Sequence, residues 1–140
     1  MIRGVGTDVV EISHFEDVVS RSRPGFLRYL FTEQEIEYCE RFQERMASYA
    51  AVFAAKEAFL KALRTGLAPG MRWTDVEVVH EPSGAPSLRV HRRCRDILGS
   101  GSAHVSLSHS ERAAQAVVII EDQFREHHEA RHSRDDARHR

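Results

Sequence analysis

The sequence predicts an α+β fold in which a small antiparallel sheet packs on one long central helix. Three observations predict this fold. A β-branched segment opens the chain at residues 2–12, a long helical pattern runs from about 45 to 63, and strand-like segments return after residue 74. Strands therefore stand at both ends of the chain, with helices between them.

The first part of the chain predicts one strand followed by helices. Residues 2–12 (IRGVGTDVVEI) are β-branched and roughly alternating, which is typical of a strand. A short helix follows, is broken at Pro24–Gly25, and continues as a further helical turn. Thr32, with Glu35 three residues later, predicts the start of the next helix.

The second part predicts one long helix, two hairpins and a short helix. The long helical pattern from about residue 45 to 63 ends near Thr65–Gly66. Strands at 74–80 and 86–91 flank the turn EPSGAP. A short helix closed by Gly99 precedes a hairpin whose strands, AHVSLSH and AAQAVVIIE, meet across the residues SER.

Composition predicts a single soluble domain over residues 1–120 and a polar tail over 121–140, either disordered or a solvated helix. The net charge of −1 excludes a nucleic-acid binder that works by bulk charge.

Cys39 and Cys94 give no disulfide framework and are expected to be buried thiols. The absence of a signal peptide or membrane-spanning run favours a cytoplasmic protein. The four histidines of the tail could bind metal adventitiously.

Lysine is rare in this chain: of 20 Lys and Arg residues, only Lys56 and Lys61 are lysines. They flank Glu57 in the long helical segment. At about 100° per residue, Lys56 falls inside the apolar stripe of the helix, whereas Glu57 and Lys61 lie one turn apart at its edge. The stripe consists of Phe53, Phe59, Leu60 and Leu63, and a second face consists of the small residues Ala55, Ala58 and Ala62.

Two interpretations of these lysines are open. One is an ordinary ion pair between Glu57 and Lys61, worth about a few tenths of a kcal/mol. However, any exposed pair would serve equally well with arginine, which this chain uses everywhere else. A compact ammonium on a slim stem favours instead a confined site for a point charge.

Asp8 falls on the apolar face of the opening strand, together with Gly4 and Gly6. A carboxylate in an apolar row must be paired, hydrogen-bonded or bound to a cation, so a structural role and a ligand role are both open. Glycines in this row permit close approach of another segment or of a ligand. Asp8 and Glu57 together form a sparse pair of oxygen ligands that suits Mg²⁺, which takes further oxygens from water and substrate phosphates.

His109 ends the apolar row of the strand at 103–109, at the mouth of a hairpin. A structural role is the commoner explanation for a single such histidine. Here a polar turn with donors suited to phosphate follows, beginning with Ser110. His104 lies on the other face and is interpreted as structural. These side chains together suit Mg²⁺ and a phosphate ester, although their spacing does not name a reaction.

Three blocks of sequence carry a resemblance. GVGTDVVEI near the start, FAAKEAFLKAL in the middle and HVSLSHS near the end occur in this order and spacing. Together they resemble the 4′-phosphopantetheinyl transferases of the holo-acyl-carrier-protein synthase type. WTDVEVVHEPSGAPSL is similar to the central hairpin of that family, and the resemblance covers about residues 1–120.

The resemblance implies the 4′-phosphopantetheinyl transferase fold and a Mg²⁺-dependent reaction. The family transfers 4′-phosphopantetheine from coenzyme A to a serine of an apo acyl carrier protein, of fatty-acid or polyketide type, and releases adenosine 3′,5′-bisphosphate. Its small subunits usually form homotrimers with active sites between neighbours. By this match Asp8 and Glu57 are the metal ligands, and they and Lys61 are the catalytic residues. Expected coenzyme A contacts are Lys61, Arg64, Gly66, His109 and Ser110.

The chain departs from the family pattern at three places. Val52 stands where an arginine is common, Arg64 begins what is usually a turn of the form GTG, and Ala85 stands where a lysine is common. Arg64 is a candidate to replace the charge lost at Val52. The alternative is that the coenzyme A pocket has diverged from the family pattern, as in a paralogue that uses its donor substrate differently.

Other charged residues are candidates for the acceptor side. Arg21, Arg23 and Arg28 are expected to form a docking patch for an acidic carrier protein, or else a merely solvated basic segment. Glu33 and Glu35 are candidates to orient a water molecule or the serine. Favourable charge at a helix N-terminus is the stronger interpretation of these two glutamates.

Two other functions compete with the transferase. A non-catalytic paralogue that binds carrier proteins would keep the fold and lose turnover, and Val52 and Arg64 favour it. An enzyme that uses an acylated carrier for different chemistry is disfavoured, because such chemistry would not need the Mg²⁺ and phosphate residues.

Overall fold

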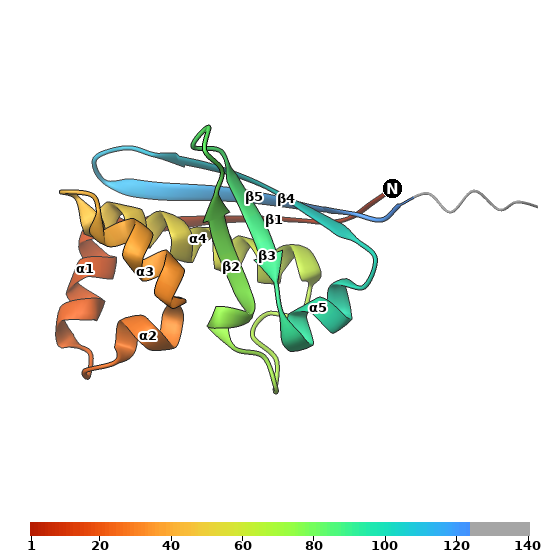
Figure 1. Ribbon diagram of the computed structural model, residues 1–140, viewed down its shortest axis with the longest axis horizontal. Helices are drawn as coiled ribbons and strands as arrows, with labels where there is room; N and C mark the ends of the chain where they lie inside the picture. The colour runs from red at the N-terminus through yellow and green to blue at the C-terminus, as the bar shows by residue number, and fades with distance from the viewer. Residues whose placement is uncertain (124–140) are drawn as a thin grey trace, which may run out of the picture.

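The computed structural model describes residues 1–123, and helix α4 (Arg45–Leu63) lies at the centre of the molecule (Figure 1). Twelve of its 19 residues are buried, because strands cover one side of the helix and α3 and β2 pack against other sides. The long central helix is therefore confirmed. Its buried surface is wider than the predicted stripe, since the alanine face is buried as well.

The remaining predicted elements occur in the predicted order, with boundaries that differ by one or two residues, and a 3₁₀ turn that was not predicted takes up the start of the strand expected at 74–80. They are β1 (Ile2–Glu11), α1 (Ile12–Arg21), α2 (Phe26–Leu30), α3 (Glu33–Glu40), the 3₁₀ turn η1 (Trp73–Asp75), β2 (Val76–His80), β3 (Pro86–Val90), α5 (Arg92–Leu98), β4 (Ser102–His109) and β5 (Ala113–Glu121).

The strands form two antiparallel sheets. The three-stranded sheet has the order β1-β5-β4 and packs on α4, which confirms the predicted α+β class. The hairpin β2–β3 forms a separate two-stranded sheet instead of extending the first one. In the larger sheet Asp8 pairs with Ala116, whereas His109 pairs with Ala114 on the far side of β5.

Strand β1 lies against α4 with almost no space between the two backbones. A Cβ atom added at Gly6 would lie 1.9 Å from the carbonyl oxygen of Ala58, and one added at Gly4 would lie 1.9 Å from that of Ala62. The close approach predicted for the glycine row is therefore a contact with the alanine face of α4, at Ala58 and Ala62. The alanine face is used within the chain, so it does not support the prediction of a trimer.

Helix α3 begins as its sequence predicts. Thr32 Oγ1 accepts a hydrogen bond from the backbone N–H of Glu35, and the Glu35 carboxylate accepts one from the backbone N–H of Thr32. Such a cap stabilises a helix by about 1 kcal/mol. The cap fixes the position of Glu35, which also contacts α4.

The two ends of the described chain are joined. The N-terminal ammonium of Met1 donates to the carbonyl oxygen of Asp122, whose side chain forms an ion pair with Arg3. Residues 121 and 122 therefore belong to the folded domain. The histidines predicted as an adventitious metal site lie outside the described residues.

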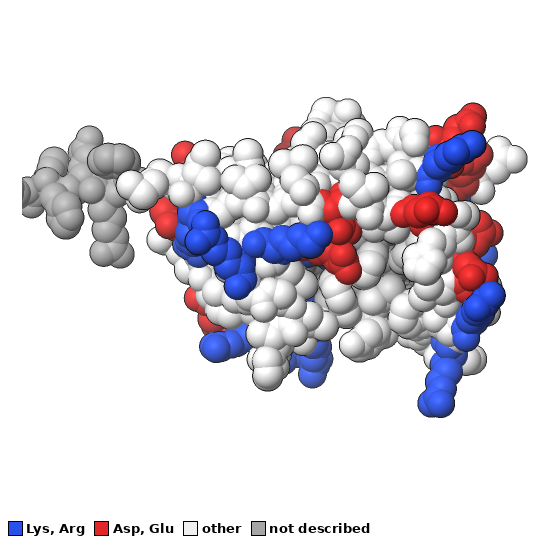
Figure 2. All heavy atoms as spheres, turned by 180° about the vertical axis from the view of Figure 1, so that it is seen from behind, with Lys and Arg blue, Asp and Glu red and all other residues white. Residues whose placement is uncertain are grey.

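Burial and charge fit the composition. Cys39 and Cys94 are buried and free, as predicted. Over residues 1–123, no helix combines the length and the apolar character needed to cross a bilayer. On the face seen in Figure 2, acidic and basic side chains lie in small groups separated by wide uncharged areas.

Candidate active site

The centre of the candidate site is formed where β1 meets α4. Lys61 Nζ lies 2.9 Å from Asp8 Oδ1 and donates a second hydrogen bond, 3.0 Å long, to the carbonyl oxygen of Thr7. Of the two open interpretations, the ordinary ion pair between Lys61 and Glu57 is not formed among the described residues, because the lysine side chain reaches across to the strand. The Asp8 side chain is only 10% exposed, whereas that of Lys61 is 55% exposed.

Glu57 lies beside Asp8 and is half-buried. Burial, the hydrogen bond to Asp8 and the charge of Asp8, in decreasing order of effect, together raise the pKa of Glu57 to about 7, while Lys61 opposes the shift. Two carboxylates so close together repel each other when both are ionised. The pair therefore holds either a shared proton or a cation.

The donor set fits a magnesium ion that is shared with a substrate. When both carboxylates are ionised, the buried Asp8 Oδ2 accepts no hydrogen bond from any of residues 1–123. The same residues contain no group of three or more His, Cys, Asp or Glu side chains that could enclose a metal by themselves. Two carboxylates leave most of the octahedron around Mg²⁺ to water and phosphate oxygens, which is how this ion is often bound.

An apolar cavity of about 390 Å³ opens beside the two carboxylates. Its walls come from β1, α1, α2, α4 and η1, and they include Phe53, Tyr29 and Trp73. The Phe53 and Trp73 rings are in contact, with a centroid distance of 5.1 Å. The cavity can take an apolar side chain from a partner and still place a polar group next to Asp8 and Glu57.

His109 lies on the other side of α4. It lines a second cavity, of about 520 Å³, together with Val52 of α4 and with Tyr38 and His80, whose rings stack 3.8 Å apart. Val52 and Glu57 project from opposite sides of the helix, since five residues correspond to about 500°. One chain therefore does not bring His109 together with the carboxylate pair.

The other expected coenzyme A contacts are at the ends of elements. Arg64 ends α4 with a left-handed backbone, φ 65°, and Gly66 N–H donates to Leu60 O, so that these residues cap the helix just after Lys61. Ser110 Oγ accepts hydrogen bonds from the backbone N–H groups of Arg112 and Ala113, both 3.3 Å long. Ser110 thus closes the turn between β4 and β5.

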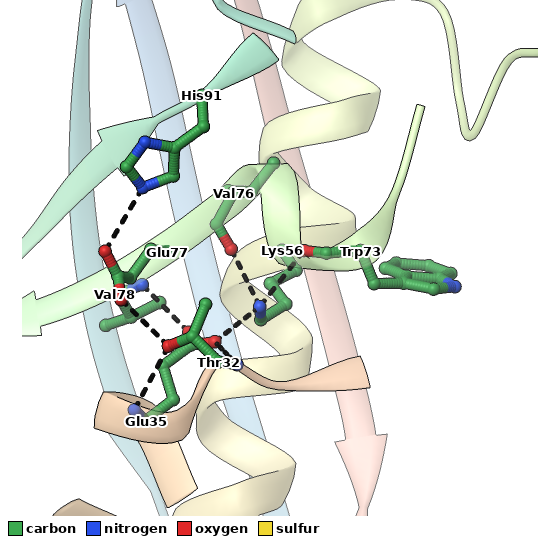
Figure 3. Close-up of polar contacts among 8 residues, drawn as sticks. All are labelled: Thr32, Glu35, Lys56, Trp73, Val76, Glu77, Val78 and His91. Atoms are coloured by element: carbon green, nitrogen blue, oxygen red, sulfur yellow. Dashed lines mark hydrogen bonds and ion pairs between the residues drawn. The ribbon is translucent and has the colours of Figure 1, made fainter. Parts of the chain in front are cut away.

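Glu35 does not belong to the candidate site. It is buried and forms an ion pair with Lys56, with 2.6 Å between Oε1 and Nζ (Figure 3). The hypothesis that Glu35 orients a water molecule or the serine is therefore wrong, because no solvent reaches it. The structure supports its role at the start of α3, and it leaves Glu33 exposed on the first turn. The confined position predicted for a lysine is that of Lys56.

The three arginines expected at a docking patch are exposed on α1, on α2 and between them. Arg21 forms an ion pair with Asp17, 3.4 Å apart, on its own helix. Arg21 and Arg23 line a shallow groove with Phe26 and Tyr29, and the same two aromatic residues line the cavity beside Glu57. The basic segment and the apolar cavity are therefore continuous.

A fold and a site of this kind define a class of protein. The family profile described as the 4′-phosphopantetheinyl transferase superfamily matches residues 4–121, and the chain belongs to this superfamily. It is 43% identical over 124 residues to the holo-[acyl-carrier-protein] synthase of Geobacter sp. (strain M21), a match that covers 86% of this chain and 99% of the relative.

Solved structures agree with this assignment and confirm the predicted fold. A holo-(acyl-carrier-protein) synthase from Bacillus anthracis, in complex with CoA (3′,5′-ADP), matches with a TM-score of 0.75 and 30% identity, over 88% of this chain and 99% of that one. The Helicobacter pylori holo-[acyl-carrier-protein] synthase in complex with coenzyme A has a TM-score of 0.75 and 31% identity, over 84% and 99%.

Sequence reasoning missed Trp73 as part of the cavity wall and Glu35 as the partner of Lys56. Trp73 is the only tryptophan of the chain, but no periodic pattern places a residue of a single 3₁₀ turn. Lys56 was marked by its position inside an apolar stripe. Its partner lies 21 residues away on another helix, a separation that helical spacing cannot reveal.

Proposed function

We propose that this protein transfers 4′-phosphopantetheine from coenzyme A to a serine of an apo acyl carrier protein. The observation that carries the proposal is the cluster of Asp8, Glu57 and Lys61 at the edge of an apolar cavity. Relatives that cover most of the chain are named for this activity, and solved relatives hold coenzyme A.

The reaction is a phosphoryl-type displacement. The serine oxygen forms a bond to the phosphorus that carries the pantetheine arm, and the bond from that phosphorus to the bridging diphosphate oxygen breaks. Adenosine 3′,5′-bisphosphate leaves, and the serine proton passes to a base or to water. Lys61 would stabilise the charge that develops on the leaving phosphate, because its ammonium is half exposed and is held at the edge of the site.

Asp8 and Glu57 would hold Mg²⁺ together with oxygens from water and from the diphosphate. The ion would neutralise the diphosphate and polarise its phosphorus–oxygen bonds. The pKa of about 7 for Glu57 supports this assignment, because a site that shares a proton between two carboxylates can exchange that proton for a cation.

The acceptor would dock on α1 and α2. An acidic carrier protein would meet Arg21, Arg23 and Arg28, which are exposed, and would insert an apolar side chain into the cavity that Phe26 and Tyr29 line. Charge complementarity of this kind raises the association rate and fixes orientation more than it raises affinity. The carrier serine would then lie next to Asp8 and Glu57.

The active protein would be a homotrimer in the cytoplasm. Within one chain, α4 separates His109 from Glu57, and a neighbouring copy can supply the missing side. The outer face of the three-stranded sheet offers a surface for such copies, because Val5 and Val9 are 56% and 62% exposed there. Two free, buried thiols fit a reducing compartment.

The experiment that tests the function is intact-protein mass spectrometry of an apo acyl carrier protein after incubation with coenzyme A and Mg²⁺. We expect a gain of one phosphopantetheine that is absent with EDTA. Glu57→Gln, which circular dichroism should show to be folded, is expected to abolish the gain. Absence of the gain with several carriers and folded wild-type protein would overturn the proposal.

The second candidate is a module that binds carrier proteins without turnover. Val52 favours it, because the cavity that also contains His109 has a buried valine where the family commonly has an arginine. Coenzyme A titration by calorimetry separates the two functions. A transferase binds the nucleotide, whereas the module would bind the carrier alone.

A further inference from the structure

The hydrogen-bond acceptors around Lys56 match the donors of an ammonium group. Its side chain is fully buried, and Nζ donates to Glu35 Oε1 at 2.6 Å, to Val76 O at 2.7 Å and to Trp73 O at 3.1 Å (Figure 3). An ammonium has three donors, and here each has one acceptor. The planar fork of arginine cannot reproduce this arrangement, which explains why lysine is retained at this position.

The contacts of Lys56 continue into a network that joins four elements. Glu35 also accepts the backbone N–H of Val78 in β2, at 2.9 Å. Thr32 Oγ1 donates to Glu77 Oε2 at 2.8 Å, and Glu77 Oε1 lies 3.2 Å from His91 Nε2. The network thus holds the start of α3, the middle of α4, the turn η1 and strand β2 in one arrangement.

One branch of this network reaches the candidate active site. The Trp73 carbonyl accepts from Lys56, while its indole ring turns away from the network (Figure 3) and lines the cavity beside Asp8 and Glu57. The same ring rests on Phe53, one turn before Glu57 on α4. The backbone of Trp73 is therefore anchored on one side of α4, and its side chain forms part of the site on another.

We infer that Lys56 is a positioning residue of the transferase, which fixes Trp73 as a wall of the cavity that receives the carrier protein. Lys56 does not line the cavity. It therefore acts through the backbone of Trp73 and through the orientation of α4 about its own axis. The inference deepens the proposed function and rests on it for the identity of the occupant. The position of Trp73 is a property of the free protein.

The test uses two variants of the full chain. Lys56→Met keeps the length of the side chain and removes its charge, but it leaves the Glu35 carboxylate buried without a cation, so this variant is expected to lose stability or to fail to fold. Lys56→Met/Glu35→Gln removes both charges and is expected to recover stability, because no unpaired charge remains. Neither variant can hold the Trp73 carbonyl.

For the double variant we expect the KM for the apo carrier protein to rise about tenfold, the loss that one hydrogen bond from a charged group corresponds to. The KM for coenzyme A should change little. Since Trp73 is the only tryptophan, fluorescence excited selectively at tryptophan, and not at the three tyrosines, reports on it alone. Its emission should shift to the red, and acrylamide should quench it more strongly than in wild type.

Val118→Ala serves as the matched control, because it opens a cavity under β5, in the core away from η1. It should lose stability and keep both the Trp73 emission and the carrier KM of the wild type.

Wild-type emission and carrier KM in the folded double variant would overturn the inference and leave Lys56 as a counter-ion for Glu35. Absence of transfer by the wild-type protein would instead overturn the proposed function, and the fluorescence comparison would still stand.

Discussion

Lys61 reaches Asp8 Oδ1 at 2.9 Å and the Thr7 carbonyl at 3.0 Å, so its ammonium bridges a carboxylate and a backbone oxygen of β1. A guanidinium is wider and directs its donors in a plane. We predict that Lys61→Arg lowers kcat/KM by about tenfold or more, since a charge-assisted contact contributes about 1.5–3 kcal/mol. The measurement is steady-state transfer to a carrier protein at saturating Mg²⁺.

The control for this variant is its fold. Lys61 is half exposed, so circular dichroism and thermal unfolding of Lys61→Arg should match wild type. Wild-type turnover by the arginine variant would remove the argument from the rarity of lysine.

The carboxylate pair predicts how stability depends on pH. Burial and the adjacent Asp8 raise the pKa of Glu57 from 4.5 to about 7. Between these two values the folded protein binds more protons than the unfolded chain, so the stability contributed by this group is present at low pH and is lost as the pH rises through about 7. In EDTA, the melting temperature of wild type relative to Glu57→Gln should therefore fall across this range.

Addition of Mg²⁺ should reverse the loss at about pH 8, because the cation replaces the proton between the two carboxylates. Glu57→Gln should respond much less to Mg²⁺. A difference between wild type and variant that stays constant with pH would show that Glu57 is ionised throughout and that Asp8 does not perturb it.

Arg64 offers a separate test of coenzyme A binding, because its left-handed backbone conformation favours glycine over arginine. At φ 65° a glycine avoids the strain of a side chain, so Arg64→Gly should stabilise the fold by about 1 kcal/mol. If Arg64 compensates for the charge missing at Val52, the same variant should raise the KM for coenzyme A about two- to fivefold. An unchanged KM would assign Arg64 to capping alone.

At this scale the sequence singled out the carboxylates, the lysines and His109 as candidates, because each stands out against an apolar or arginine-rich background. It did not reveal that Lys61 pairs with Asp8 instead of Glu57. That choice depends on the distance between β1 and α4, which the two glycines set.

Among the elements, β1 and α4 form the contact on which the site depends. A methyl group at Gly6 would lie 1.9 Å from Ala58 O and 2.7 Å from Ala62 N, and both are backbone atoms that cannot move aside. We predict that Gly6→Ala destabilises the fold by about 3 kcal/mol or more, the upper part of the range for overpacked cores. Chemical denaturation of the variant measures this loss.

Gly84→Ala is the comparison for that variant. Gly84 lies in the β2–β3 turn with open space around it, so alanine there costs only the left-handed conformation, about 1 kcal/mol. Equal losses for the two variants would show that β1 can shift along α4, which would contradict the close packing.

The elements themselves were predictable, because caps, glycine breaks and alternation are local signals, and Thr32 with Glu35 is one example. The pairing of the strands was less predictable. Alternation indicates that Val76–His80 is a strand, but it does not say whether the hairpin extends the main sheet or forms one of its own.

For the whole molecule, the main observation is that the cavity with Glu57 and the cavity with His109 lie on different sides of α4, so that each would be a half-site in the proposed assembly. If copies associate as proposed, Glu57→Gln and His109→Ala should complement each other. Each variant alone should be inactive, and an equal mixture that is unfolded and refolded together should regain about a quarter of wild-type activity, since one interface in four combines two intact sides.

The control is the same mixture without refolding, in which preformed assemblies keep their own subunits. Light scattering should show the same mass for both variants and the mixture. Refolded mixtures of the correct mass that regain no activity would show that the proposed sharing is wrong. In that case either both half-sites lie in a single copy, or His109 takes no part in the reaction.

The unequal exposure of the two lysines has a practical consequence for chemical labelling. Lys56 is fully buried and Lys61 is 55% exposed, so an amine-reactive reagent applied to the native protein has one lysine to modify, besides the N-terminal amine. A fluorophore or a cross-linker can therefore be attached beside the carboxylate pair without mutagenesis. Coenzyme A that occupies the site would shield this amine, so the labelling rate would itself become a binding assay.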